Sequence, residues 1–194
     1  ASIPDDLTAY SAGGSAYTLI WDNNNNPSST NYEITQSLDN FQTNISTPIS
    51  FSSRYQNTRT LLTGLAPGLT YFFRVRAVNM NNILTEYSAS FAMVAATPPG
   101  TSSETVSSSE SSRVTTADNS TILSFESGTF DTNAVIYIST DPLHYPMQAN
   151  QDQIETAIER LNGYQVLEEL IREFNAITNN QYANNNFSQR VRIE

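Results

Sequence analysis

The single histidine, His144, is the first residue to consider for acid–base chemistry, because imidazole titrates near neutral pH. A general base needs a carboxylate within hydrogen-bond reach, and Asp141 lies three residues earlier in the chain. Pro142 and Pro146 place both residues in a turn-rich segment, where such pairs often arise by chance. We therefore interpret His144 as a solvated turn residue and predict no catalytic residue.

The remaining acidic residues add no catalytic candidate. Four glutamates pair on two predicted helix faces, Glu155 with Glu159 and Glu169 with Glu173. Such pairs are typical of the solvated side of amphipathic helices. The chain has no phosphate-binding loop, no nucleophile elbow and no EF-hand loop. We predict that it is not an enzyme and that it needs no cofactor or metal, with Ca²⁺ at the Asn-rich loops 23–26 or 184–186 as an open alternative.

Charge and cysteine content exclude several classes of protein. The 194 residues include no lysine, nine arginines and 19 acidic residues, for a net charge of −10. Such a chain is a poor partner for nucleic acid, whose phosphates are bound by basic residues. The absence of cysteine excludes disulfides, zinc–thiolate sites and thiol nucleophiles. No stretch reaches 18 apolar residues, so we expect no membrane insertion.

Residues 7 to about 97 show short alternating runs separated by turn residues, which is typical of a β-sandwich. Tyr17, Leu19 and Trp21 fall on one face of a strand, because side chains alternate across it. A second set of alternating apolar residues supplies the facing layer: Tyr71, Phe73, Val75 and Ala77.

Residues 62–79, which read LTGLAPGLTYFFRVRAVN, resemble the E–F corner and F strand of a fibronectin type III domain. Trp21 and Tyr32 stand where that family places the Trp of strand B and the Tyr of strand C. The resemblance implies an immunoglobulin-like, seven-stranded sandwich over residues 1–98, with Tyr71 as its corner tyrosine. The Arg-Gly-Asp tripeptide of the family is absent, so its integrin-binding mechanism is not implied.

The rest of the chain is predicted as a connector and a second module. Residues 99–113 are rich in Ser and Thr, which favours a flexible linker; the alternative is an edge strand around Val106 and Val114. Residues 114–194 are predicted as a small α+β module that is incomplete within these 194 residues. The segment 124–130 is similar to turns of β-rich modules in bacterial surface proteins.

Apolar spacing divides the predicted module into strands and helices. Residues 121–125 and 134–138 are predicted strands, and 190–194 a final strand. Helical spacing appears in two runs: Ile154, Ala157, Ile158 and Leu161, then Val166, Leu167, Leu170, Ile171, Phe174 and Ile177. The chain opens without Met, and its last residues alternate like a strand. We therefore expect it to be a piece of a longer polypeptide.

The outward-facing residues of the predicted F strand give a candidate interaction surface. Phe72, Arg74 and Arg76 alternate with the inward positions, and the family arrangement brings Glu33 beside them. One interpretation is cross-strand stabilisation. The other is docking of a neighbouring module, because aromatic residues and Arg are enriched in interfaces. Stacking on sugars is a third, with three further candidates: Tyr10, Tyr55 and Tyr87.

These observations predict a non-catalytic structural or adhesion piece of an extracellular or cell-surface protein. It would space or present partners, which would be other protein modules or copies of itself, with strand edges as a route to assembly. The alternative is a carbohydrate- or polymer-binding accessory module of a secreted hydrolase. N-glycosylation sequons begin at Asn44, Asn119 and Asn186, and they apply only to a secreted chain in an organism with that machinery.

Overall fold

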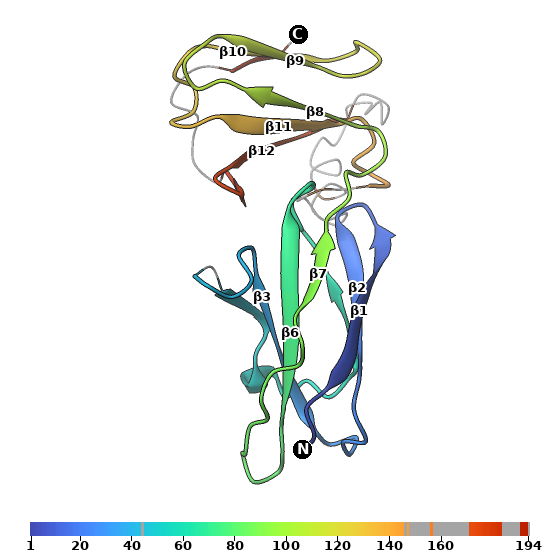
Figure 1. The fold of residues 1–194 in the computed structure, drawn as a ribbon. Helices are drawn as coiled ribbons and strands as arrows, with labels where there is room; N and C mark the ends of the chain where they lie inside the picture. Colours follow the sequence, from blue (N-terminus) through green and yellow to red (C-terminus); the bar gives the residue numbers. More distant parts are fainter. Residues whose placement is uncertain (44, 146, 148–155, 157–170, 184–190, 194) are drawn as a thin grey trace. The chain divides into compact units, whose positions relative to one another are not determined.

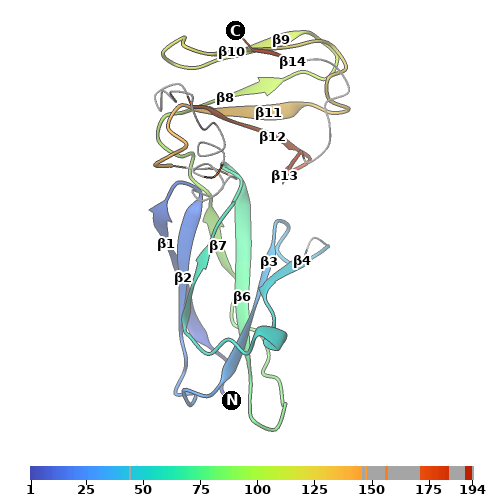
Figure 2. The same cartoon turned by 180° about the vertical axis from the view of Figure 1, so that it is seen from behind.

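The chain folds into two compact units, Ala1–Ala95 and Ala96–Glu194, shown from opposite sides in Figures 1 and 2. The computed structural model describes residues 1–43, 45–145, 147, 156, 171–183 and 191–193. No helix among these residues has the length and apolar character that crossing a membrane requires.

The first unit contains two antiparallel sheets (Figure 1). The three-stranded sheet has the order β1-β2-β5: Asp5–Gly13, Ala16–Asp22 and Arg59–Leu62. The four-stranded sheet has the order β4-β3-β6-β7: Ile45–Ile49, Asn31–Ser37, Thr70–Val78 and Phe91–Val94. A short 3₁₀ helix, η1, covers Phe51–Ser53. The predicted seven-stranded sandwich is thus confirmed.

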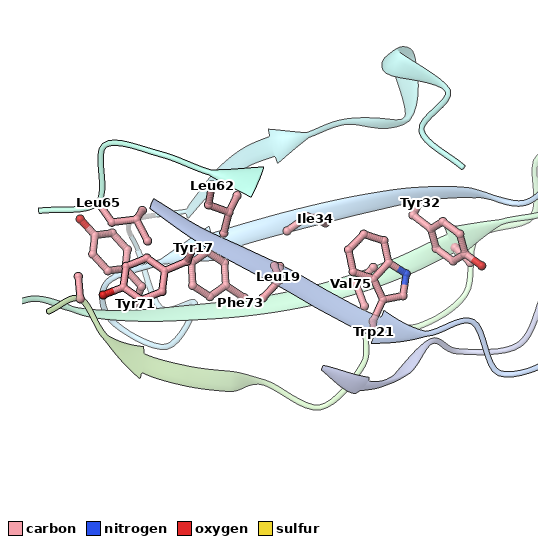
Figure 3. Close-up of a cluster of buried hydrophobic side chains, with 12 residues drawn as sticks. Tyr17, Leu19, Trp21, Tyr32, Ile34, Leu62, Leu65, Tyr71, Phe73 and Val75 are labelled. Atoms are coloured by element: carbon pink, nitrogen blue, oxygen red, sulfur yellow. The ribbon is translucent and has the colours of Figure 1, made fainter. Parts of the chain in front are cut away.

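The two sheets of the first unit enclose one aromatic core (Figure 3). Alternate residues of β2 point into it, as the sequence predicts: Tyr17, Leu19 and Trp21. Trp21 meets Tyr32 of β3 edge-on, with ring centroids 5.6 Å apart, an arrangement that aromatic pairs favour.

Tyr71 forms the predicted tyrosine corner. Its hydroxyl accepts a hydrogen bond of 2.8 Å from the backbone N–H of Ala66. Gly68, at φ +76°, turns the chain, and its N–H donates to the carbonyl of Ala95 at 2.7 Å. Burial raises the pKa of Tyr71, and the bond from Ala66 acts against that rise. The corner therefore fixes the start of β6.

The second unit also contains two antiparallel sheets that share one core. One sheet has the order β14-β10-β9: Val191–Ile193, Ile122–Phe125 and Ser112–Thr115. The other has the order β13-β12-β11-β8: Gln181–Tyr182, Glu173–Thr178, Ala134–Ser139 and Thr101–Val106.

The prediction of a linker over residues 99–113 was wrong. Its residues supply β8 and the start of β9, so two strands stand where the alternative interpretation placed one edge strand around Val106 and Val114. Both valines are almost completely buried, at 0 and 1% exposure. Each strand lies at the edge of its sheet, so most neighbouring side chains stay polar and conceal the alternation.

The α+β assignment of residues 114–194 is not supported. Glu173–Thr178, predicted as the end of a helix, forms β12 and pairs with β11, with Ala176 opposite Ile136. A two-residue turn of Asn179 and Asn180, both with positive φ, then leads to β13, which is the geometry of a tight hairpin. The other predicted helical positions, from Ile154 to Leu170, lie outside the described residues.

Candidate interaction surface

The outer face of the four-stranded sheet of the first unit carries the predicted arginines. Three alternate residues of β6 are completely buried: Phe73, Val75 and Ala77. Alternation therefore turns Arg74 and Arg76 outward. The register with β3 then sets their cross-strand neighbours. Arg76 lies opposite Glu33, Arg74 opposite Thr35, and Phe72 opposite Ser37.

Arg76 is neutralised by Glu33. Its Nε and Nη2 contact the same carboxylate oxygen, Oε1, at 2.8 and 2.7 Å. The Tyr87 hydroxyl donates to that oxygen as well, at 3.0 Å. Only 12% of the Glu33 side chain is exposed, so this carboxylate lies in a partly dry environment where charge-assisted hydrogen bonds are strengthened.

Arg74 is held between two aromatic rings. Its guanidinium carbon lies 3.8 Å from the ring centre of Tyr87 and 4.0 Å from that of Phe41. Its Nε donates to the Thr35 hydroxyl at 3.1 Å. Each such cation–ring contact contributes about 0.5–1 kcal/mol at an exposed site and more when water is excluded.

The two arginines and three rings form one stack. Arg76 lies 4.6 Å from the ring centre of Tyr87 and 5.4 Å from that of Phe51. The order along the face is therefore Phe41, Arg74, Tyr87, Arg76, Phe51. We call these five residues the arginine–aromatic array. All five side chains are partly buried.

Tyr87 is positioned by a segment that runs alongside β6 and is hydrogen-bonded to it. On either side of Tyr87, the N–H groups of Thr85 and Ser88 donate to the carbonyls of Ala77 and Val75 at 2.9 and 2.8 Å. Their hydroxyls accept from the N–H groups of the same two residues at 3.0 and 3.1 Å. These four bonds hold the tyrosine ring between the guanidinium groups.

Phe41 is placed by a tightly bonded turn after β3. Its φ is +64°, and its N–H donates to the Ser37 hydroxyl at 2.9 Å. The Asp39 carboxylate accepts from the N–H groups of Gln42 and Thr43 at 3.1 and 2.8 Å. A turn with this much internal bonding keeps the phenyl ring over Arg74.

Electrostatics keep the central tyrosine protonated. Burial raises the pKa of Tyr87, and both its hydrogen bond to Glu33 and the charge of that carboxylate raise it further. The positive charges of Arg76 and Arg74 act in the opposite direction. Tyr87 therefore remains a hydrogen-bond donor at physiological pH.

The structure brings Glu33, Arg74 and Arg76 together on one face, and it adds Phe41, Phe51 and Tyr87 to them. Phe72 lies on the same face, partly buried and opposite Ala92 of β7. Sequence reasoning missed both phenylalanines, because each lies in a non-periodic segment. It considered Tyr87 only as a sugar-stacking residue. The role of this face as an interaction surface remains a prediction.

The three tyrosines considered for sugar stacking do not form a common platform. The ring of Tyr87 is in contact with the guanidinium groups of Arg74 and Arg76. Tyr55 packs against Trp21, with ring centroids 6.5 Å apart, and its hydroxyl donates to the carbonyl of Arg59. Tyr10, on β1 of the other sheet, is 60% exposed.

In the second unit, His144 Nδ1 lies 2.7 Å from Asp141 Oδ1, and the histidine is exposed. No group of three or more acidic or histidine side chains in the described part of the chain is arranged to hold a metal ion. Asn119 lies exposed in the turn between β9 and β10 at φ +56°, whereas Asn44 and Asn186 lie outside the described residues.

The Asn-rich loop 23–26 is occupied by local hydrogen bonds. The side-chain amide of Asn26 exchanges two of them with the backbone of Ser2, at 2.6 and 2.8 Å, and Asn24 donates to the carbonyl of Ile3 at 2.9 Å. The loop thereby ties the N-terminal segment to the end of β2. Residues 184–186 lie outside the described residues.

Comparison with known proteins finds a family match within the first unit. Residues 2–94 match the model of the fibronectin type III domain. An Fn3-like protein from Clostridium thermocellum is 25% identical, with 47% of this chain and 88% of that chain covered and a TM-score of 0.39. The FN5 domain of Drosophila Lar is 20% identical, with 51 and 98% covered and a TM-score of 0.37. A fibronectin type III domain of human fibronectin type III domain containing protein 3 is 17% identical, with 51 and 89% covered and a TM-score of 0.42.

None of the curated proteins matches the sequence. Fibronectin type III domains are commonly extracellular structural or binding modules and are generally non-catalytic. The matched residues include the core pair of Trp21 and Tyr32 and the corner tyrosine, Tyr71. Residues 2–94 of this chain are therefore a fibronectin type III domain.

Proposed function

We propose that the chain is a non-catalytic structural part of an extracellular or cell-surface protein, which spaces or presents partners. In this proposal the fibronectin type III domain docks a neighbouring protein module through the outer face of β3 and β6. The single observation that carries the proposal is the arginine–aromatic array.

The array has the properties of a binding surface that is ordered in advance. Two guanidinium groups and three rings restrain one another, and hydrogen bonds hold Arg76 and Tyr87 to Glu33. A partner that docks there has few side chains to immobilise, which lowers the entropic cost of binding. Arg and Tyr are also among the residues that dominate binding energy in interfaces.

A photo-cross-linking experiment tests the docking face. A photoreactive amino acid replaces Phe72, beside the array, in the full protein within its source organism. The matched control carries it at Leu61, which is 58% exposed on β5 of the other sheet. We expect a discrete cross-linked protein from position 72 that is reduced by Arg74→Gln. Equal products from both positions, or none from position 72, would contradict the proposal.

The extracellular location is tested separately. An antibody against the chain should label intact cells of the source organism as strongly as permeabilised ones. Labelling that requires permeabilisation would overturn the location.

One observation keeps a carbohydrate-binding accessory module as a second candidate function. Tyr10 is exposed on β1, and an exposed aromatic ring is a surface on which a sugar can stack. Retention of the chain on insoluble cellulose or chitin, with loss of retention in Tyr10→Ala, would favour this function. No retention would remove it.

A further inference from the structure

The two arginines of the array differ in what their guanidinium groups contact. Arg76 directs Nε and Nη2 at the carboxylate of Glu33. Arg74 directs Nε at the uncharged hydroxyl of Thr35. Within the described part of the chain, no carboxylate forms an ion pair with Arg74 and no acceptor meets its terminal nitrogens. One cation of the array is therefore neutralised and the other is not.

The environment of Arg74 fixes the direction in which it can bind a ligand. The rings of Phe41 and Tyr87 both pack against its planar guanidinium, and Thr35, which is 3% exposed, occupies the Nε donor. What remains is the pair of terminal nitrogens. Their parallel N–H groups match the two oxygens of a carboxylate, and this pairing is stronger and more directional than one with a lysine ammonium.

Charge narrows the class of ligand. The first unit carries four arginines and six acidic residues, so its net charge is −2, and the whole chain carries −10. A polyanion such as nucleic acid or a sulfated polysaccharide needs several cations in a row, and the array offers one that is not neutralised. A ligand with a single negative charge fits this surface better. Phe72 lies two residues before Arg74 on the same face. We therefore expect the ligand residues that flank the negative charge to be apolar.

We propose that Arg74 binds the carboxylate of a single Asp or Glu within an otherwise uncharged, apolar segment of another protein. The terminal nitrogens of Arg74 donate to both carboxylate oxygens, and Thr35, Phe41 and Tyr87 hold the guanidinium in place. This inference rests on the proposed function, because it names the ligand chemistry of the same docking surface.

The test uses the full chain labelled with ¹⁵N and a blocked peptide, acetyl-Gly-Leu-Glu-Leu-Gly-amide, followed by NMR. A matched peptide carries Gln in place of Glu. We expect the Glu peptide to shift the Arg74 Nε–H signal and backbone signals of β3 and β6. Its apparent affinity should fall about tenfold in Arg74→Lys and Arg74→Met, and the Gln peptide should bind about tenfold more weakly, because each change removes the paired, charge-assisted hydrogen bonds between guanidinium and carboxylate.

Arg59→Lys is the matched control variant, because Arg59 is exposed on β5 of the other sheet. It should leave the affinity of the Glu peptide unchanged, and amide signals far from the array should report an intact fold in every variant. Equal binding of the two peptides, or undiminished binding to Arg74→Lys and Arg74→Met, would overturn the proposal.

Two further arms test the class of partner. Heparin that displaces the Glu peptide at an equal concentration of negative charge would overturn the assignment to a single carboxylate. Sedimentation should find no self-association that depends on Arg74. If self-association is found and is lost on substitution of Arg74, the partner is a second copy of this chain and the assignment to another protein is wrong. Cross-linking at position 72 without peptide binding would leave the docking face intact and refute the carboxylate chemistry alone.

Discussion

Replacing Tyr71 with phenylalanine removes one hydroxyl group from the core of the first unit and leaves the ring in place. That hydroxyl accepts a hydrogen bond of 2.8 Å from the backbone N–H of Ala66. The two residues are 6 and 2% exposed, so water does not readily replace the lost acceptor. Tyr71→Phe therefore isolates a single buried hydrogen bond at the corner that leads into β6.

The expected loss of stability follows from that one group. An N–H left buried and unpaired costs about 1–3 kcal/mol. The ring of Tyr71 keeps its stacking on Phe73, whose ring centre lies 6.3 Å away, so the apolar contribution stays nearly constant. We expect a loss of about 2 kcal/mol. For a unit of this size, each kcal/mol lowers Tm by about 4–8 °C, which gives a decrease of roughly 8–16 °C.

The assay is thermal unfolding of the full chain followed by tryptophan fluorescence. Trp21 is the only tryptophan and is buried in the same core, so its emission reports the first unit alone. Tyr10→Phe is the matched control: it removes the same hydroxyl at a site that is 60% exposed, and we expect a change within about 0.5 kcal/mol. Equal melting temperatures for the two variants would refute the reasoning.

The same variant also changes the alkaline stability. Burial raises the pKa of Tyr71 above its ordinary value of 10.0. From about pH 10 upward to that raised pKa, the native state keeps a proton that the unfolded chain loses. The free energy of unfolding therefore falls as pH rises through this window and is unaffected below it. Denaturant unfolding at increasing pH should show a shallower decline in Tyr71→Phe, and an equally steep decline would contradict this assignment.

Three other substitutions test the fold and the array. Trp21→Ala should destabilise the first unit by about 3–5 kcal/mol through the cavity left in its core. If the thermal unfolding curve of this variant, followed by circular dichroism, overlapped that of the parent protein, the sandwich assignment would be wrong. Glu33→Gln should destabilise the same unit by about 1–2 kcal/mol, because Arg76 loses its ionic partner; the loss is moderate since water reaches Arg76, which is 25% exposed. A double-mutant cycle with Arg76→Met measures the coupling energy of the pair, and a value of zero would contradict the pairing. Val106→Asp should unfold the second unit, because it places a charge at a completely buried position; circular dichroism should change while Trp21 fluorescence keeps its parental transition, and an unchanged spectrum would restore the linker interpretation.

The fold of the first unit is predictable from sequence because its pattern is periodic and its landmarks are local. Tyr17, Leu19 and Trp21 alternate without interruption. The corner needs only Tyr71 and the turn before it, since its hydrogen bond joins residues five positions apart. Alternation also places Arg74 correctly on the outer face, because its two neighbours on β6, Phe73 and Val75, point into the core.

The stack around Arg74 is not predictable in the same way. Phe41 reaches it from a turn with positive φ that depends on hydrogen bonds to Ser37 and Asp39. Tyr87 reaches it because Thr85 and Ser88 bond to β6 through both backbone and side chain. None of these residues follows a period, so no window of sequence reveals that they converge.

In the second unit, by contrast, a regular spacing of apolar residues predicts a helix where the structure has a strand. Phe174 and Ile177 are three residues apart, as on a helix, yet they lie in β12 because Ala176 pairs with Ile136 of β11. Long-range pairing of this kind overrides local spacing. The useful local signal is the Asn179-Asn180 turn, which closes a hairpin with β13.

The distinction between Arg74 and Arg76 depends on a single cross-strand neighbour. Both arginines stand at alternate positions of β6 and contact the ring of Tyr87. Glu33 stands opposite Arg76, whereas Thr35 stands opposite Arg74. The Glu33 carboxylate pairs with Arg76 across the two strands, whereas the Thr35 hydroxyl orients Arg74 without neutralising its charge. A shift of one strand by two residues that brought Glu33 opposite Arg74 would leave Arg76 opposite Asn31, so the register between β3 and β6 decides which arginine is neutralised.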